Sequence, residues 1–391
     1  MSRPLVGLSA VLLAVACAVP ALAQSNLANC KFYTKTQQDF QTGIKYCAEC
    51  IKDEPDNPEA RFYGAWCLAE VGRFSEAWDS FHWLIERASD KDKDIQKHAK
   101  MASERVSFYY GTHFNEGVKY LNADNVASAR DEFMKATQIN PTKAGGFLDL
   151  GYAQNRLGDT DGALASFRKA IEISPDSTAY EYYSVALSNK AAALGKESDS
   201  LRAVTPPDTA SLGKVNASLA QVQTDLKATL QKVVETTPSN DAALTQLGQL
   251  ELDAGEDSLA ILHFQKAIEI KPDNVVKLYN VAVGFYQKDQ FEKAAKSFAI
   301  VTDHADTTAD ASLWRDSMYN RTLALKSLNR NDEALTCVQK LIAYNDKDPD
   351  YHQLASTIYV NLKQVDKAEA EFERATALKQ QAVQGKPRAG K

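Results

Sequence analysis

The 391 residues predict an all-α fold, a solenoid of stacked antiparallel helix pairs, and two observations support it. The first is a glycine, an alanine, a phenylalanine, a second alanine and a proline that recur 34 residues apart. They stand at Gly117, Ala129, Phe133, Ala136 and Pro141, at Gly151, Ala163, Phe167, Ala170 and Pro175, and at Gly248, Ala260, Phe264, Ala267 and Pro272. The second is the apolar content of 44%, which suits amphipathic hairpins, and a fixed period of this length is typical of helical repeat arrays.

Each period is interpreted as one helical hairpin. Gly151 and Ala163 are small and fall on opposite helices, so they permit the two backbones to approach closely. Phe167 and Ala170 share one face of the second helix, where a large side chain fills the space that small ones leave. Pro175 cannot continue a helix, so the chain turns there. One hairpin buries too little apolar surface alone, and stacking of neighbours completes the core.

These residues make the chain similar to the tetratricopeptide repeat (TPR) family. Phe147, Leu150 and Gly151 match the family pattern in one repeat, and Leu244 with Gly248 match it in another. About eight or nine repeats in this frame cover about nine-tenths of the chain. The resemblance implies a right-handed α-solenoid, the TPR superhelix, and a scaffold that binds other proteins.

Residues 1–23 have the pattern of a secretory signal peptide. After a positive start, an uncharged apolar stretch runs from Leu5 to Val19, and Ala21-Leu22-Ala23 matches an A-x-A cleavage site before Gln24. The apolar stretch is shorter than the about 20 residues that a transmembrane helix needs. We therefore expect an exported protein, in the periplasm rather than outside the cell. A lipid anchor on Cys17 is a weaker alternative, because the residues before it make a poor lipobox.

The period divides the rest of the chain into four segments. Residues 24–177 hold the N-terminal repeats, with a cysteine-rich first repeat. Residues 178–240 form one extended repeat, whose excess near 195–213 is rich in Gly, Pro and Asp and predicts a loop insertion. Such a loop would act as a hinge between two arms of the solenoid. Residues 241–378 hold the C-terminal repeats, and residues 379–391 form a basic tail that we expect to be disordered.

Four of the six cysteines gather at the start of the mature chain, at Cys30, Cys47, Cys50 and Cys67. By repeat register, Cys30 lies on the first helix, Cys47 and Cys50 lie on the second, and Cys67 lies on the third. The pairs Cys30–Cys47 and Cys50–Cys67 are each 17 residues apart, so each would link adjacent antiparallel helices. Disulfides are chemically reasonable in an exported protein, and each would stabilise the terminal repeat by about 3 kcal/mol. We predict both disulfides.

Two other uses of the same cysteines stay open. Cys47-Ala48-Glu49-Cys50 is a C-x-x-C pair, the pattern of thiol–disulfide chemistry, but by register it lies in mid-helix. That position is away from the helix N-terminus that lowers a thiol pKa. A zinc site of four cysteines would require the paired helices to bring all four sulfurs together.

No catalytic or cofactor-binding pattern occurs in the sequence. It holds no H-E-x-x-H, G-x-S-x-G, phosphate-binding loop or dinucleotide fingerprint, and its six histidines occupy unrelated repeat positions. The stretch from Asn345 to Asp350 lacks the glycine and the final glutamate of a calcium loop, so it predicts a capped helix start. We expect no catalytic residue, no cofactor and no metal. A net charge of −6 argues against a nucleic-acid partner, and no transmembrane segment is expected.

The TPR resemblance also implies where a ligand would lie. In the family, the first helix of each repeat lines a concave groove, and an asparagine at its sixth position often hydrogen-bonds an extended peptide. Asn and Gln amides offer a donor and an acceptor together, and tyrosines and tryptophan add contact area. The candidate groove residues are Gln246, Asn280, Asn320, Tyr279, Tyr286 and Tyr319 in the later repeats and Asn115, Trp66 and Tyr152 in the earlier ones. Asp149 takes the sixth position in a middle repeat and interrupts this amide series.

Three functions from different classes follow from this sequence. The preferred one is an exported, non-catalytic scaffold that holds a protein or an extended peptide in its concave groove. The second is a constitutive structural subunit of an envelope assembly or secretion complex, associated with the membrane through its partners. The third, less favoured, is a thiol–disulfide active protein that uses Cys47 and Cys50.

Overall fold

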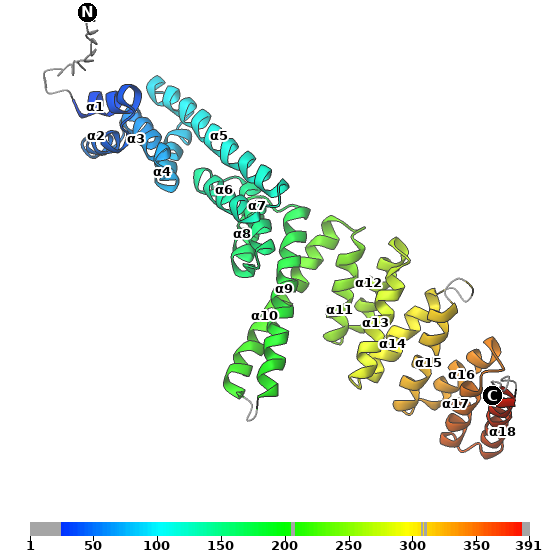
Figure 1. Ribbon diagram of the computed structural model, residues 1–391. Coiled ribbons are helices and arrows are strands. Elements are labelled where there is room, and N and C mark those ends of the chain that lie inside the picture. The colour runs from blue at the N-terminus through cyan, green and yellow to red at the C-terminus, as the bar shows by residue number, and fades with distance from the viewer. Residues whose placement is uncertain (1–24, 205–207, 306–307, 309–310, 385–391) are drawn as a thin grey trace, which may run out of the picture. The chain divides into compact units, whose positions relative to one another are not determined.

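The computed structural model describes residues 25–204, 208–305, 308 and 311–384, and within them the chain forms eighteen α-helices and no strand (Figure 1). The chain divides into two compact units, an N-terminal unit that ends at Ser174 and a C-terminal unit that begins at Pro175. Successive helices pair within each unit. The predicted all-α solenoid of helix pairs is therefore confirmed in each unit.

The helices of the N-terminal unit follow the predicted repeats. They are α1 (Asn26–Phe32), a π-helical turn η1 (Tyr33–Gln37), α2 (Phe40–Asp53), α3 (Pro58–Glu70), α4 (Phe74–Ile85), α5 (Lys93–Asn122), α6 (Val126–Ile139), α7 (Ala144–Arg156) and α8 (Thr160–Ile173). The leader, residues 1–23 with Cys17, lies outside the described residues. In the described part of the chain no helix is long and apolar enough to cross a membrane.

The C-terminal unit continues the alternation of first and second helices. Its helices are α9 (Ser177–Ala203), α10 (Thr209–Thr236), α11 (Asp241–Asp253), α12 (Asp257–Ile270), α13 (Asn274–Gln287), α14 (Phe291–His304), α15 (Ala311–Ser327), α16 (Asn331–Tyr344), α17 (Pro349–Asn361) and α18 (Val365–Gln384). Helix α13 packs against α15, and α12 packs against α14, so first helices neighbour first helices and second helices neighbour second helices.

The repeat glycines hold the hairpins together at close range. A Cβ added to Gly151 would lie 2.7 Å from the Phe167 ring, and one added to Gly117 would lie 2.6 Å from the Phe133 ring. Both phenylalanines are almost fully buried. The prediction that small residues face a large one across the hairpin is confirmed, because the ring occupies the space where a side chain would stand.

Each hairpin turn uses a left-handed residue to end its first helix. Gly158 and Gly255 have φ near +81°, and Asp124 and Asp289, 34 residues away from each, have φ of 60° and 57°. A residue in this conformation closes the helix C-terminus and sends the chain back. The second helix then starts with a side-chain cap in several repeats; the Asp159 carboxylate, for example, accepts a hydrogen bond from Gly162 N at 3.0 Å.

The loop predicted near 195–213 is wrong for the described residues, since α9 and α10 are helical through Ala203 and from Thr209. The segment before Ala203 contains no proline, and its run of Ala, Leu, Lys and Glu favours a helix despite Gly195, which costs about 1 kcal/mol. The two helices pack along their length, with Ser198 Oγ donating to Asn216 Oδ1 at 2.8 Å. The Pro206-Pro207 pair lies outside the described residues.

The disordered tail predicted from residue 379 is also wrong at its start. Helix α18 continues to Gln384, because the sequence up to that residue has no glycine or proline to end it. The rest of the predicted tail, residues 385–391, lies outside the described part of the chain.

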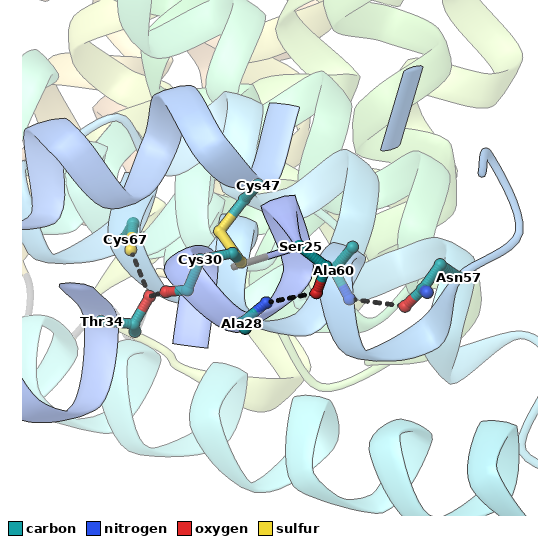
Figure 2. Close-up of a disulfide and its surroundings, with 8 residues drawn as sticks. All are labelled: Ser25, Ala28, Cys30, Thr34, Cys47, Asn57, Ala60 and Cys67. Carbon is teal, nitrogen blue, oxygen red and sulfur yellow. Dashed lines mark hydrogen bonds between the residues drawn. A yellow bond between two sulfur atoms is a disulfide. The ribbon is translucent and has the colours of Figure 1, made fainter. Parts of the chain in front are cut away.

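One of the two predicted disulfides is present. Cys30 of α1 and Cys47 of α2 are bonded, with their Cα atoms 4.8 Å apart (Figure 2). Cys50 and Cys67 are free, so the second predicted pair is wrong. A Cβ added to Gly43 would lie 2.7 Å from Cys67 Sγ, which places Cys67 level with Gly43 of α2. Cys50 lies two helical turns further on, about 10 Å along the axis, and cannot reach it.

The two free thiols lie in surroundings that suppress their reactivity. The Thr34 hydroxyl donates to the Cys30 carbonyl at 2.6 Å and lies 3.0 Å from Cys67 Sγ, so the Cys67 thiol is the donor to that hydroxyl (Figure 2). Burial raises the pKa of both Cys50 and Cys67. A raised pKa is the opposite of what thiol–disulfide chemistry requires. The zinc alternative is also wrong, because Cys30 and Cys47 are bonded to each other.

We predict opposite effects of alanine at two glycines of the N-terminal unit. Gly151→Ala would push a methyl group into the Phe167 ring and lower the free energy of unfolding by about 1–3 kcal/mol. Gly111 lies within α5 with nothing within 4 Å of an added Cβ. Gly111→Ala should therefore raise stability by about 0.5–1 kcal/mol. Urea unfolding followed by circular dichroism measures both, and an unchanged Gly151→Ala variant would contradict the packing described.

We also predict that peptide mapping under non-reducing conditions recovers Cys30 linked to Cys47. Cys50 and Cys67 should react with iodoacetamide only after the protein is unfolded, because both are buried. Cys30→Ser with Cys47→Ser should lower stability by about 3 kcal/mol, since the closed loop is lost from the unfolded chain. Cys50→Ala serves as the control and should change stability less. A linked Cys50–Cys67 peptide would contradict the register of α2 and α3.

Candidate functional site

The most polar candidate site is a pocket in the C-terminal unit, formed by first helices of three successive repeats. It lies between α13, α15 and the start of α17 and has a volume of about 260 Å³. Its lining residues are Tyr279, Arg315, Asp316, Tyr319, Asn320, Asp348, Asp350 and Tyr351. Three of the predicted groove residues are thus brought together here: Tyr279, Tyr319 and Asn320.

Helical periodicity places the tyrosines at the edge of the core. Leu278 and Met318 are buried in the cluster between the helix layers, and the residue that follows each, Tyr279 or Tyr319, is half-buried beside it. The Tyr279 ring packs at 5.8 Å from the Phe298 ring, and the Tyr319 ring lies 6.3 Å from that of Tyr351. The rings are therefore positioned by core contacts, with their hydroxyl ends left at the pocket.

Asn320 joins two of the helices. Its Nδ2 atom donates to the Tyr279 hydroxyl at 3.5 Å, a long contact that bridges α15 and α13. At this length the hydrogen bond is weak, and the amide can exchange it for a ligand's backbone groups. The same residue therefore supplies both a donor and an acceptor at the pocket.

The charges around the pocket are unbalanced. Arg315 Nε donates to Asp316 Oδ1 at 2.9 Å, so this pair neutralises itself. Asp348 caps α17 by accepting from Asp350 N at 3.0 Å, which confirms the predicted capped helix start. Lys379 Nζ lies 3.9 Å from Asp350, and both side chains are more than half exposed, so that contact is weak. Three aspartates and one arginine leave two negative charges among the lining residues.

The tyrosine hydroxyls respond to this negative field. Burial raises the pKa of Tyr279, and the Asp316 carboxylate adds to the shift. Burial also raises the pKa of Tyr319, with further contributions from Asp350 and Asp348. Burial, followed by Asp348, raises the pKa of Tyr351 to about 12. All three phenols are held in their neutral, hydrogen-bonding form.

The other groove residues predicted in the C-terminal unit lie outside this pocket. Gln246 Nε2 donates to Ser188 Oγ at 2.6 Å, so its amide is engaged by α9. Asn280 is exposed on α13. The Tyr286 ring packs edge-on against Phe291 at 5.3 Å. The predicted series of three amides is therefore present as an order along the chain, while Asn320 alone contributes to the pocket.

The groove residues predicted in the N-terminal unit are distributed differently. Trp66 lines a separate pocket of about 340 Å³ with Phe62, Met101, Glu104, Arg105 and Phe108. The Arg105 guanidinium lies over the Trp66 ring at 3.6 Å, and Trp66 Nε1 donates to Glu70 Oε1 at 2.8 Å. Asn115 is exposed on α5, and Tyr152 is half-buried on α7, outside both pockets.

Five lining residues of the C-terminal pocket were not predicted: Arg315, Asp316, Asp348, Asp350 and Tyr351. A signal for two of them was present, because Asp316 and Asp350 hold the second position of their repeats, which also faces the groove in the family. Asp348 and Arg315 lie at repeat boundaries, where the sequence pattern describes turns. The described residues include no group of three or more His, Cys, Asp or Glu side chains able to hold a metal ion.

Comparison with known proteins identifies the repeats. A sequence profile of the tetratricopeptide repeat matches residues 144–177, 242–274 and 349–381. Superkiller protein 3 of Schizosaccharomyces pombe is 20% identical over 358 residues, which are 89% of this chain. The chain spans 22% of the length of that relative.

Solved structures of repeat proteins share the architecture. YrrB, described as a TPR protein with an unusual peptide-binding site, is 16% identical, with a TM-score of 0.38 over 52% of this chain and 89% of its own. A tetratricopeptide repeat protein from Parabacteroides merdae is 14% identical, with a TM-score of 0.37 over 69% of this chain and 93% of its own.

The three matched repeats lie in the same frame as the helix pairs described above. Residues 144–177 cover α7 and α8, residues 242–274 cover α11 and α12, and residues 349–381 cover α17 with most of α18. The chain is therefore a tetratricopeptide repeat protein.

Proposed function

We propose that this protein is a non-catalytic scaffold whose C-terminal unit binds an extended peptide of a partner protein. Tetratricopeptide repeats support a role in protein–protein interaction. The observation that carries the finer proposal is the pocket lined by Tyr279, Tyr319 and Asn320. It combines aromatic contact area, a weakly engaged amide and a volume too small for most small-molecule ligands, which occupy about 300–1,000 Å³.

The chemistry of these groups suits a peptide of varied sequence. Every peptide unit presents one N–H and one C=O, and the Asn320 amide can pair with both. Tyr279 and Tyr319 offer contact area at a modest cost in side-chain entropy, because each has few rotatable bonds and is already held by core rings. The groove would therefore fix the backbone, and the pocket would receive a side chain.

We further propose that the protein acts after export, in the periplasm or a comparable oxidising compartment. The Cys30–Cys47 disulfide supports this proposal, because such bonds persist mainly in oxidising surroundings. The leader pattern of residues 1–23 supports it independently.

A constitutive structural role is the second candidate, and the α9–α10 hairpin is the observation that favours it. These helices have 27 and 28 residues against 13 in α11, so at 1.5 Å per residue they are about twice as long. Their far ends extend beyond α11 in Figure 1. Such an extended arm would suit a permanent contact with a folded partner.

We predict that peptides selected for binding depend on the pocket. Random twelve-residue peptides displayed on phage are selected on the full chain and compared with the Asn320→Ala/Tyr319→Ala variant. Losing the amide and the ring should weaken the selected peptides by about 1–3 kcal/mol, while circular dichroism stays unchanged. Peptides that bind both proteins equally would remove the pocket from consideration. A native partner that survives this variant and is lost when the α9–α10 arm is shortened would favour the structural role instead.

Export makes a separate prediction about the mature N-terminus. Protein recovered from its native host should begin at Gln24, because cleavage follows Ala23. Edman sequencing or intact mass measures this. A chain that begins at Met1 would contradict export, and a lipid-modified chain that begins at Cys17 would favour the anchored form.

A further inference from the structure

We infer that the pocket between α13, α15 and α17 receives a cationic side chain, lysine or arginine, of the bound peptide. This inference rests on the proposed peptide-binding function and adds the class of residue that the pocket selects. Three features carry it: tyrosine rings, an excess of carboxylates and the absence of a resident cation over those rings.

The rings provide the first part of the site. Tyr279, Tyr319 and Tyr351 line the pocket from three successive first helices. The face of an aromatic ring carries partial negative charge and attracts an ammonium or guanidinium group within about 6 Å of its centre. Because core contacts hold Tyr279 and Tyr319, little ordering is needed when such a group enters.

The carboxylates provide the second part. Asp316 spends its charge largely on Arg315, while Asp348 and Asp350 face only Lys379 at 3.9 Å, an exposed and screened contact. An incoming cation would meet two uncompensated negative charges, and an incoming carboxylate would be repelled by them. The raised pKa values of the three phenols report the same negative field.

The N-terminal unit shows how this chain satisfies a similar arrangement internally. There, Arg105 lies 3.6 Å over the Trp66 ring, and its guanidinium is 3.8 Å from the Glu70 carboxylate. That aromatic ring and carboxylate already hold a guanidinium. Throughout residues 25–204, 208–305, 308 and 311–384, no lysine or arginine lies over the rings of Tyr279, Tyr319 or Tyr351. The C-terminal pocket has the same groups and lacks the cation.

The test uses pools of ten-residue peptides, acetylated and amidated, that differ only in a central Lys, Arg, Leu or Glu among uncharged residues. Their affinities for the full chain are measured by fluorescence anisotropy at 0.1 M NaCl. The Lys and Arg pools should bind roughly five- to tenfold more tightly than the Leu pool, and the Glu pool should bind more weakly than the Leu pool. At 0.5 M NaCl the preference should shrink, because salt screens the carboxylates.

Variants assign the preference to the pocket. Asp316→Asn with Asp350→Asn should reduce the Lys and Arg pools to the affinity of the Leu pool. The matched control, Glu369→Gln with Glu373→Gln, removes the same charge from exposed positions of α18 and should keep the preference. Tyr319→Phe retains the ring and should also keep it, whereas Tyr319→Ala should weaken it.

The outcomes separate this inference from the proposed function. Pools that bind equally, yet are all weakened by Asn320→Ala, would overturn the cation preference and leave peptide binding intact. A Leu pool with a free N-terminus that matches the acetylated Lys pool would show recognition of an α-ammonium group and overturn the side-chain assignment. If no pool binds while circular dichroism shows a folded protein, the proposed function itself fails.

Discussion

The fold depends on one contact, the seating of a phenylalanine ring of the second helix where the first helix has a glycine. Phe133 meets Gly117, Phe167 meets Gly151, and Phe264 meets Gly248, and in each case an added Cβ would lie 2.6–3.2 Å from the ring. This contact fixes which face of the first helix is turned inward. Leu278 and Met318 therefore enter the core, and the residues that follow them, Tyr279 and Tyr319, must lie at its edge. The pocket is a geometric consequence of how the hairpins close.

The period of the sequence was sufficient to predict the helix pairs, because it records a contact that every repeat makes. It was insufficient for features that depend on one register. Cys30–Cys47 and Cys50–Cys67 have the same separation along the chain, but the second pair lies two helical turns out of level because Cys67 faces Gly43. Near residue 200, Gly195 and the prolines suggested a loop, whereas packing between α9 and α10 extends both helices. Local propensity lost to a tertiary contact there.

The candidate site was predicted for the same reason and to the same extent. Residues that repeat, such as Tyr319 and Asn320, were found because the groove positions recur. Arg315 and Asp348 were not, because they belong to the ends of repeats, which come together only when first helices stack. Gln246 illustrates the converse: its position in the repeat is right, but Ser188 of the extended helix α9 engages its amide at 2.6 Å. Repeat position predicts which face a side chain occupies, and neighbouring repeats decide whether it is available.

Asp149 shows that carboxylates are retained in the groove of the N-terminal unit as well, at a cost to stability. It occupies the position that Asn320 holds in its own repeat, and burial raises its pKa to about 6. Its charge also raises the pKa of Tyr110, after the larger effect of burial. A carboxyl group whose pKa is higher in the folded than in the unfolded chain stabilises the fold at low pH. That contribution is lost as the pH rises from about 4 through 6. An asparagine of nearly the same shape would avoid this loss, so stability alone does not account for an acid there, and the groove of each unit carries negative charge that folding does not require.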